Sequence, residues 1–522
     1  MDSNKKSLIK GVSILGVYGL ICKIIGVVFR IPLALIIGDD GLGVYQLVFP
    51  TYAMLLTISS AGIPVAISHG ISSALAVNDK RTAEKTFKIA LILLSALGLI
   101  TTIFMVLNAE FLSEKVGNPK TKMGFITIAP SLFIVCVMSA FRGYTQGQRD
   151  MKPTAVSQLI EQIGKVAFAL PLAYIGMKSS VVNAAAGALL GTSLAELLAL
   201  LYIFFAYRKD KNSDNDIVQN ASLPEQNNKS IAINLIKMAV PITIGACVVP
   251  LSGFVDSAML VNRMRDIGFS VDEASRLYGL YSGLVITLIN VPTALAVAIS
   301  MTLVPTISSA MSAKRYDSVQ RQSLQGLRYA FLIGLPCSFG MSVLAKPILH
   351  FFYSSLGVES VNTASSLLQV SSFTILLFTV VQATSGILQG LKHERIPMYT
   401  LALGVLIKIV LNYYFVGQKD INIYGAPYAS IVCYTISMIP NIYYVNKYCN
   451  IKFDWMACVV RPGLACIVMW LVMKLLSGIL PFGRISTIIL IIIGMVVFIF
   501  FAYIFKAITK EDISILFRRR HA

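Results

Sequence analysis

The sequence contains little charge for its length. Only 13% of its 522 residues are Asp, Glu, Lys or Arg, whereas a soluble domain has about 25%. Hydrophobic residues make up 56% of the chain, and the mean hydropathy is +0.74. No stretch between the apolar runs is long enough to fold into a soluble domain. This composition is typical of a chain that crosses a membrane many times.

The sequence also lacks the usual signatures of a metal or nucleotide site. Its eight cysteines are scattered without a CxxC pair, and its four histidines are isolated from one another. It has no GxxxxGK(S/T) phosphate loop, and the GDDGLG segment at 38–43 is not followed by Lys and Ser or Thr. We therefore expect no metal, no cofactor and no hydrolysis of ATP by this chain, and we do not expect an enzyme.

Apolar runs of about 20 residues, the length of a membrane-spanning helix, recur along the whole chain. They predict an all-α polytopic membrane protein with fourteen spanning helices. The predicted spans are 8–37, 45–76, 86–108, 123–146, 153–176, 180–207, 231–262, 278–311, 324–355, 363–390, 396–417, 424–447, 457–480 and 486–507.

The net charge of +19 is explained by orientation in the membrane. With the N-terminus inside, most of the Lys and Arg fall in cytoplasmic loops and tails, among them Lys80, Arg81, Arg208 and the run 518–520. This bias is the positive-inside rule, and it predicts a multi-pass protein of the cell membrane with both termini in the cytoplasm. No nucleic-acid partner is needed to account for the charge.

The longest polar stretch, RKDKNSDNDIVQNASLPEQNNK at 208–229, is typical of a flexible linker. It predicts a six-helix lobe at 1–207, a cytoplasmic linker at 208–229, a second six-helix lobe at 230–447, and helices 13 and 14 with a basic tail at 448–522.

The two predicted lobes resemble each other in sequence. QGQRDMKP at 146–153 matches QGLKHERIP at 389–397, and nineteen residues after each leading Gln stands a lysine, Lys165 or Lys408. More loosely, PVAISHGISSAL at 64–75 matches AVAISMTLVPTISSAM at 296–311. Two matches in the same order indicate an internal duplication. Both basic loops are predicted to be cytoplasmic, so the halves should run parallel, related by an axis along the membrane normal.

One predicted span carries a polar stripe. In FRGYTQGQRDMKPTAVSQLIEQIGK (141–165), the polar residues Gln158, Glu161, Gln162 and Lys165 are spaced i, i+3, i+4 and i+7, so they share one helical face. Lys165 lies about 18 Å beyond Pro153 at about 1.5 Å per residue, near the middle of a hydrocarbon core of about 30 Å. We predict that Glu161 and Lys165 form an i, i+4 ion pair.

Other charges also fall within predicted spans. Lys23 and Arg30 share a face of the first helix with Gly19 and Gly26, and Lys408 is as deep as Lys165. Intramembrane charges usually face a cavity and carry function, although snorkelling or a buried ion pair is the alternative for each. Snorkelling is the better reading for Lys474, near an outer helix end. Glu196 is expected to pack against a partner or to cap a network.

The predicted cavity, a water-filled space between the lobes, has a positive surplus. The predicted substrate-binding residues are Lys23, Arg30, Gln158, Glu161, Gln162, Lys165, Asp256 and Lys408. Cations in a semi-dry cleft suit a phosphate-bearing anion, and Arg binds two oxygens at once. A multidrug exporter for organic cations would instead need acids and aromatics.

Three segments together carry a family resemblance: KIIGVVFRIPLALIIGDDGLGVYQL (23–47), AGIPVAIS (61–68) and the 141–165 block. They resemble the family of stage V sporulation protein B and the polysaccharide biosynthesis transporters. That family belongs to the multidrug/oligosaccharidyl-lipid/polysaccharide flippase superfamily, which includes lipid II flippases. The resemblance implies two lobes in a V, with helices 13 and 14 forming a groove for a polyprenyl tail. It also implies cavity-facing cations on helix 1, where this chain has Lys23 and Arg30.

The resemblance and the charges leave several functions open. The first is a flippase that moves an undecaprenyl-diphosphate-linked sugar from the inner to the outer leaflet, a peptidoglycan precursor such as lipid II, with use in the spore cortex. The second is the same machine for another surface polysaccharide or a teichuronic-type unit. The third is a cation-coupled multidrug exporter, and a scaffold for cell-wall synthesis enzymes is disfavoured because scaffolds need no deep charges. We expect a monomer that is driven by the membrane potential or by a monovalent cation. Its expected partners are the polyprenyl-diphosphate-linked sugar, the lipid bilayer and cell-wall synthesis enzymes.

Overall fold

The computed structural model describes residues 2–213, 227–451, 453–480 and 483–508. Within these ranges every regular element is a helix, which confirms the predicted all-α class. The chain forms two compact units, residues 1–279 and 280–522, which are described separately below. The predicted linker at 208–229 and the basic tail fall largely outside the described residues. The predicted lobe boundaries therefore remain a prediction.

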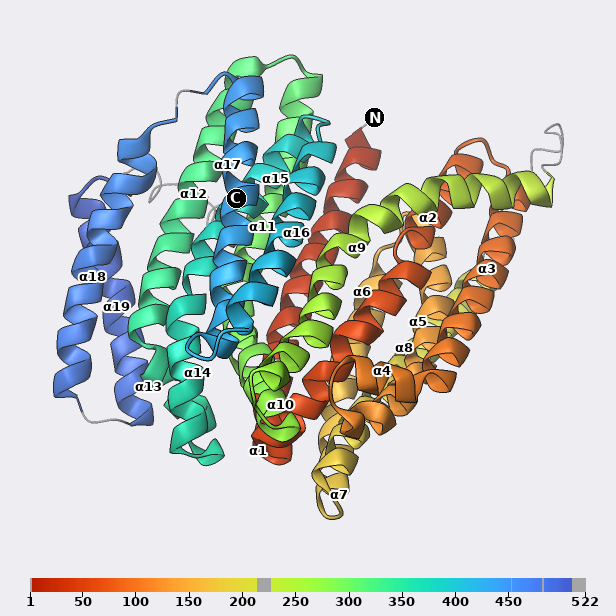
Figure 1. The fold of residues 1–522 in the computed structure, drawn as a ribbon. Helices are drawn as coiled ribbons and strands as arrows, with labels where there is room; N and C mark the ends of the chain where they lie inside the picture. The colour runs from red at the N-terminus through yellow and green to blue at the C-terminus, as the bar shows by residue number, and fades with distance from the viewer. Residues whose placement is uncertain (1, 214–226, 452, 481–482, 509–522) are drawn as a thin grey trace. The chain divides into compact units, whose positions relative to one another are not determined.

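The first unit begins with a long helix that is broken once. α1 spans Asp2–Ser60 and contains Gly38 in a non-helical conformation with φ 69°. An unbroken helix of that length would extend about 88 Å at about 1.5 Å per residue, far more than a bilayer core of about 30 Å. Gly38 allows the reversal because glycine adopts positive φ without steric cost. Figure 1 shows the chain turning back at the lower end of α1.

The other elements of the first unit are helices joined mostly by short turns. They are α2 Ile63–Ala76, α3 Lys80–Leu107, α4 Ala109–Lys115, η1 Pro119–Thr121, α5 Lys122–Gly147, α6 Lys152–Gly164, η2 Lys165–Ala169, α7 Leu170–Met177, α8 Val181–Ser213, α9 Asn228–Asp266 and α10 Val271–Gly279. Small residues bring these helices close together. A Cβ atom at Gly164 of α6 would lie 2.9 Å from the Cβ atom of Ala195 of α8, the close approach that small residues permit between membrane helices.

The second unit is built in the same way. Its elements are η3 Leu280–Val285, α11 Ile286–Ser312, α12 Tyr316–Val343, α13 Ala345–Tyr353, η4 Ser354–Leu356, α14 Val358–Ser371, α15 Phe373–Gly390, α16 Arg395–Val416, η5 Asn422–Tyr424, α17 Gly425–Cys449, η6 Met456–Val460, α18 Arg461–Ile479 and α19 Arg484–Ile504. α15 packs against α11, α12 and α17, and α18 packs against α19 and α12. The predicted helices 13 and 14 thus correspond to η6 with α18, and to α19.

Matched helix contacts support the duplication inferred from the sequence. In the first unit Gly147 of α5 packs on Ile71 of α2, where an added Cβ would lie 2.8 Å from the Cβ of Ile71. In the second unit Gly390 of α15 packs on Ile307 of α11, with a corresponding distance of 2.9 Å. Both pairs occupy matching positions in the two sequence alignments, QGQ with QGL and ISSAL with ISSAM.

The turns after these helices are also repeated. Arg149 (φ 66°) follows α5 and Lys392 (φ 65°) follows α15. Each turn is closed by a backbone bond of the Schellman type, in which Asp150 N–H donates to Thr145 O and His393 N–H to Leu388 O. Non-glycine residues rarely adopt positive φ, so the same conformation at both matched positions supports common ancestry of the two halves.

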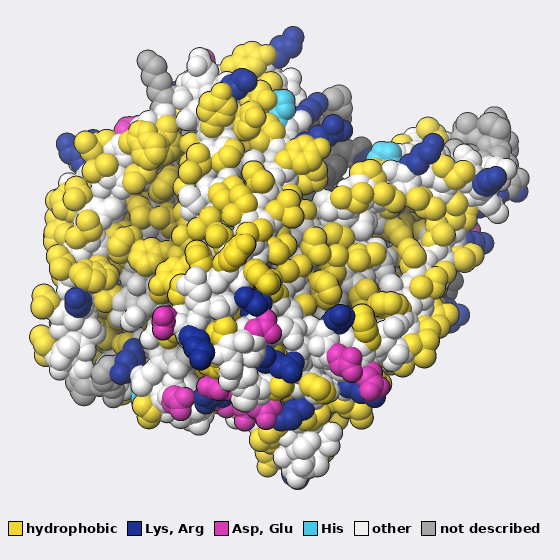
Figure 2. Space-filling model, viewed as in Figure 1, with side chains coloured by type: hydrophobic (Ala, Val, Ile, Leu, Met, Phe, Trp, Pro, Cys, Tyr) yellow, Lys and Arg dark blue, Asp and Glu magenta, His cyan; other side chains and the backbone are white. Residues whose placement is uncertain are grey.

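Hydrophobic surface is consistent with membrane burial. Twelve helical segments in the described ranges are long and apolar enough to cross a membrane, and one of them, Ile21–Ala76, contains the break at Gly38. α17 is not among the twelve. The protein is a polytopic membrane protein, and the count of fourteen spans remains a prediction. Figure 2 shows a face whose middle is covered mostly by hydrophobic side chains, with Lys and Arg near both its upper and lower parts and most of its Asp and Glu toward the lower part.

The predicted orientation can be tested by cysteine labelling. In a variant without the eight native cysteines, single cysteines at Asp150 and Lys392 should resist an impermeant thiol reagent in intact cells. Single cysteines at Lys178 and Lys419 should react, because these turns follow the opposite helix ends. Labelling at Asp150 and Lys392 from outside would overturn the orientation, and labelling at only one of the two would overturn the parallel duplication.

Candidate functional site

An ion-pair network lies inside the first unit. Glu161 of α6 binds two cations: its Oε1 accepts from Lys165 Nζ at 2.8 Å, and its Oε2 accepts from Arg142 Nη2 of α5 at 3.3 Å. The Nε–H of Arg142 also donates to Ser157 Oγ at 2.9 Å. The three charged side chains are only 14–16% exposed. The predicted Glu161–Lys165 pair is confirmed.

Lys165 lies at the start of a distorted helical turn, and the local sequence explains the distortion. α6 ends at Gly164, and Lys165 opens a π-helical turn, η2, that ends at Ala169. Pro171 follows at the start of α7 and has no N–H to give to the carbonyl of residue 167. A π-turn widens the helix just before this missing bond, and such turns are frequent at functional sites.

The polar stripe of α6 faces the first half of α1. α1 packs against α6, and a Cβ atom at Gly26 would lie 3.4 Å from Oε1 of Gln162. Gly26 shares its helical face with Lys23 and Arg30. Lys23 is exposed and Arg30 is half-buried, as are Gln158 and Gln162. The structure therefore brings the cationic face of α1 next to the Glu161–Lys165 stripe within one unit.

A second acid lies beside this network. Glu196 of α8 is 2% exposed, and its Oε1 accepts a hydrogen bond from Tyr52 OH of α1 at 3.0 Å. Glu196 follows Ala195, the residue on which Gly164 of α6 packs, and Lys165 follows Gly164. The expectation that Glu196 packs against a partner is confirmed by Tyr52.

The remaining predicted residues lie elsewhere in the fold. Asp256 is half-buried on α9, one turn after Gly253, where an added Cβ would lie 3.7 Å from the Cβ of Pro50 of α1. Lys408 lies in the second unit and is 9% exposed. Substrate binding by these residues, and by the others predicted with them, remains a prediction.

Lys408 differs from its counterpart Lys165 in its surroundings. The position that matches Glu161 is Gly404, and a Cβ atom there would lie 2.5 Å from the carbonyl oxygen of Cys433 on α17. A glutamate cannot fit at that position without moving α16 away from α17. The duplicated lysine therefore has no acid four residues before it, and the i, i+4 pair of the first unit is not repeated at this position.

Two members of the site were missed by the sequence analysis. Arg142 lies within the predicted span 123–146. Charged residues inside a span are candidates for function, so Arg142 could have been predicted on the same ground as Lys165. Tyr52 carried no signal, because tyrosine is common in membrane helices and its contact with Glu196 joins residues 144 positions apart. Lys474, assigned to snorkelling, lies over the ring of Trp470 at 4.9 Å.

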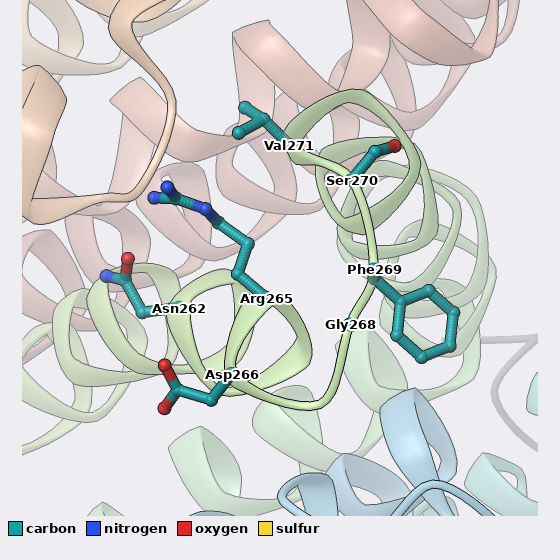
Figure 3. A pocket seen from close by; sticks show the side chains of 7 residues that line it. All are labelled: Asn262, Arg265, Asp266, Gly268, Phe269, Ser270 and Val271. Atoms are coloured by element: carbon teal, nitrogen blue, oxygen red, sulfur yellow. The ribbon is translucent and has the colours of Figure 1, made fainter.

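Other candidate sites are weaker. The turn between α9 and α10 contains an open pocket lined by Asn262, Arg265, Asp266, Gly268, Phe269, Ser270 and Val271 (Figure 3). Arg265 donates to Gly117 O at 3.4 Å and Asn262 to Lys115 O at 2.8 Å, so both side chains hold the neighbouring α4–η1 segment. Among the residues that the structure describes, no group of three or more His, Cys, Asp or Glu is placed to hold a metal ion.

The network carries one more positive than negative charge, since Glu161 is shared by Lys165 and Arg142. Arg142 has five N–H donors and Lys165 has three, and the bonds described above use only two and one of them. The unused donors suit an anion with several oxygen atoms, such as a phosphate group. This chemistry is suited to the binding of an anion.

The sequence is similar to known families and proteins. The model of the polysaccharide biosynthesis protein family matches residues 8–311, and that of the MatE family matches residues 282–414. Stage V sporulation protein B of Bacillus subtilis is 28% identical over 430 residues, which cover 82% of this chain and 81% of that protein. The lipid II flippase MurJ of the same organism is 26% identical over 460 residues, 85% of this chain and 84% of that protein.

Solved structures agree on the fold. The lipid II flippase MurJ in an inward closed conformation has a TM-score of 0.68 at 14% identity, covering 94% of this chain and 98% of that chain. An inward-facing multidrug resistance transporter of the MATE family has a TM-score of 0.68 at 16% identity, covering 82% and 94%. Because the first family model matches more than half of the sequence, the chain belongs to the polysaccharide biosynthesis protein family.

Proposed function

We propose that the protein is a flippase that moves an undecaprenyl-diphosphate-linked sugar from the inner to the outer leaflet by alternating access. It is a transporter and not an enzyme. A peptidoglycan precursor such as lipid II is the first candidate substrate, with use in the spore cortex, because similar proteins include stage V sporulation protein B and a lipid II flippase. The observation that carries the proposal is the semi-buried network of Arg142, Glu161 and Lys165 with its surplus of positive charge.

The proposed mechanism exchanges ion-pair partners. In the absence of substrate, Glu161 neutralises part of the charge of Lys165 and Arg142. A diphosphate brings more negative charge and more acceptor oxygens than one carboxylate, so it competes for both cations. Lys23 and Arg30 on the adjacent face of α1 add further positive charge. Release at the other leaflet lets Glu161 bind its cations again, which resets the site.

Another lipid-linked polysaccharide unit is the second candidate, since the matching family is described by polysaccharide biosynthesis. A cation-coupled drug exporter is the third, supported by the MatE match at 282–414. The positive surplus of the network argues against organic cations. Purified protein in liposomes should flip lipid-linked sugars that carry a diphosphate and should not move cationic dyes. Export of dyes without flipping of any lipid-linked sugar would refute the flippase proposal.

Lys165→Ala should impair flipping more than Glu161→Gln does. The first variant removes a cation that binds the diphosphate, while the second removes only its competitor. A hydrogen bond to a charged group contributes about 1.5–3 kcal/mol, so the initial flipping rate of Lys165→Ala at subsaturating substrate should fall at least about tenfold. Lys178→Ala, which removes an exposed lysine of the same unit, is the control and should be unaffected.

A charge swap separates a substrate role from a structural one. Glu161→Lys combined with Lys165→Glu keeps an acid and a base four residues apart but moves the cation by about 6 Å along the axis at about 1.5 Å per residue. The swapped protein should reach normal membrane abundance yet flip poorly. Full flipping by the swapped protein would mean that the pair is structural and that Lys165 does not bind substrate.

Arg30→Lys should reduce flipping although it keeps the charge. A lysine binds as a point charge, whereas arginine binds two phosphate oxygens at once. Lys23→Ala with Arg30→Ala should abolish flipping without lowering membrane abundance, as measured by immunoblot of isolated membranes. Normal flipping by this double variant would remove the face of α1 from the proposed site.

A further inference from the structure

Glu196 is a buried acid with an incomplete set of partners. Its side chain is 2% exposed, Tyr52 OH donates to its Oε1 at 3.0 Å, and its Oε2 has no hydrogen-bond partner. Among the ion pairs of the described residues, none includes Glu196. Glu161, by contrast, is bound by two cations. The two acids of the same unit are therefore in opposite environments.

The energies of the two protonation states differ widely in this environment. An ionised carboxylate that has only hydroxyl groups and no counter-ion in contact is among the most costly groups to bury. A neutral carboxyl group with one unsatisfied oxygen costs only about 1–3 kcal/mol. Tyr52 is a suitable donor to the carbonyl oxygen of a neutral acid. The contacts of Glu196 therefore favour the neutral form of its carboxyl group over the ionised form.

The neighbouring groups connect this acid to the ion-pair network. Gly164 and Ala195 are in direct contact, and Lys165 and Glu196 each follow that contact by one residue. The titratable groups that act on Glu196 from the helices packed around it are Tyr45 and Tyr52 on α1, and Glu161 and Lys165 on α6 and η2. α5 contributes Ser131, whose hydroxyl lies close to the carboxyl group of Glu196 and donates to the hydroxyl of Ser193 on α8.

We propose that Glu196 is a proton-binding site, occupied by a proton in this conformation and linked to the Glu161–Lys165 pair on the adjacent helix. While the pair is closed, Glu161 neutralises Lys165, and Glu196 keeps its proton. When the pair opens with Lys165 unneutralised, the positive charge favours the ionised form of Glu196, and the proton leaves. The inference needs no particular substrate, because it depends only on the pair and on Glu196.

Infrared spectroscopy of the purified full-length protein tests the proposal directly. The carboxyl C=O absorption of a protonated acid should appear in the difference between the wild type and E196Q at neutral pH and should vanish on alkalinisation. E161Q removes the acid that neutralises Lys165, so the band should vanish at a pH lower by about one unit, the smaller end of the effect of a nearby charge. Lys165→Ala should shift the loss of the band in the opposite direction by a similar amount.

Two controls keep the result decisive. Lys178→Ala removes a lysine outside the network and should leave the pH dependence of the band unchanged. E196Q has the shape and neutrality of the protonated acid, so its thermal unfolding midpoint at neutral pH should equal that of the wild type. The absence of a difference band at neutral pH would overturn the proton site. A band with the same pH dependence in E161Q, Lys165→Ala and the wild type would overturn its link to the pair.

Discussion

Charge inside a bilayer must be neutralised within the protein, and in this structure that requirement centres on Glu161. One carboxylate binds Lys165 on its own helix and Arg142 on the preceding one, and these contacts fix how α5 and α6 lie against each other. The arrangement leaves a surplus of positive charge and unused donors on both cations. An anionic ligand can therefore replace Glu161 without leaving a cation unpaired, which makes the network suited to repeated binding and release.

The two units share matched helix contacts, but they differ at the position of Glu161. The same glycine–isoleucine contact and the same positive-φ turn recur at matched positions of both units. A lysine also recurs, as Lys165 and Lys408. The glutamate does not recur, because the matching residue, Gly404, packs on the backbone of α17 and leaves no space for a larger side chain. The i, i+4 acid–base pair of the first unit is therefore not repeated at the matched position of the second unit, so the proposed exchange of ion-pair partners is assigned to the first unit.

Much of this could be read from the sequence, for identifiable reasons. Apolar runs depend on composition, and the Glu161–Lys165 pair depends only on helical spacing, so both can be recognised in the local sequence. The contact of Arg142 with Glu161 and that of Tyr52 with Glu196 depend on how helices pack, which spacing does not encode. The π-turn at Lys165 could have been suspected from Pro171, since a proline removes a backbone donor within a helix.

The central claim is that the cationic network of the first unit recognises a diphosphate. Equilibrium binding of undecaprenyl diphosphate and undecaprenol to the purified protein tests it most directly. The wild type should prefer the diphosphate by at least about tenfold, which corresponds to about 1.4 kcal/mol, and Lys165→Ala should lose most of this preference while Lys178→Ala keeps it. Equal affinities for the two lipids in the wild type, or an undiminished preference in Lys165→Ala, would contradict the account.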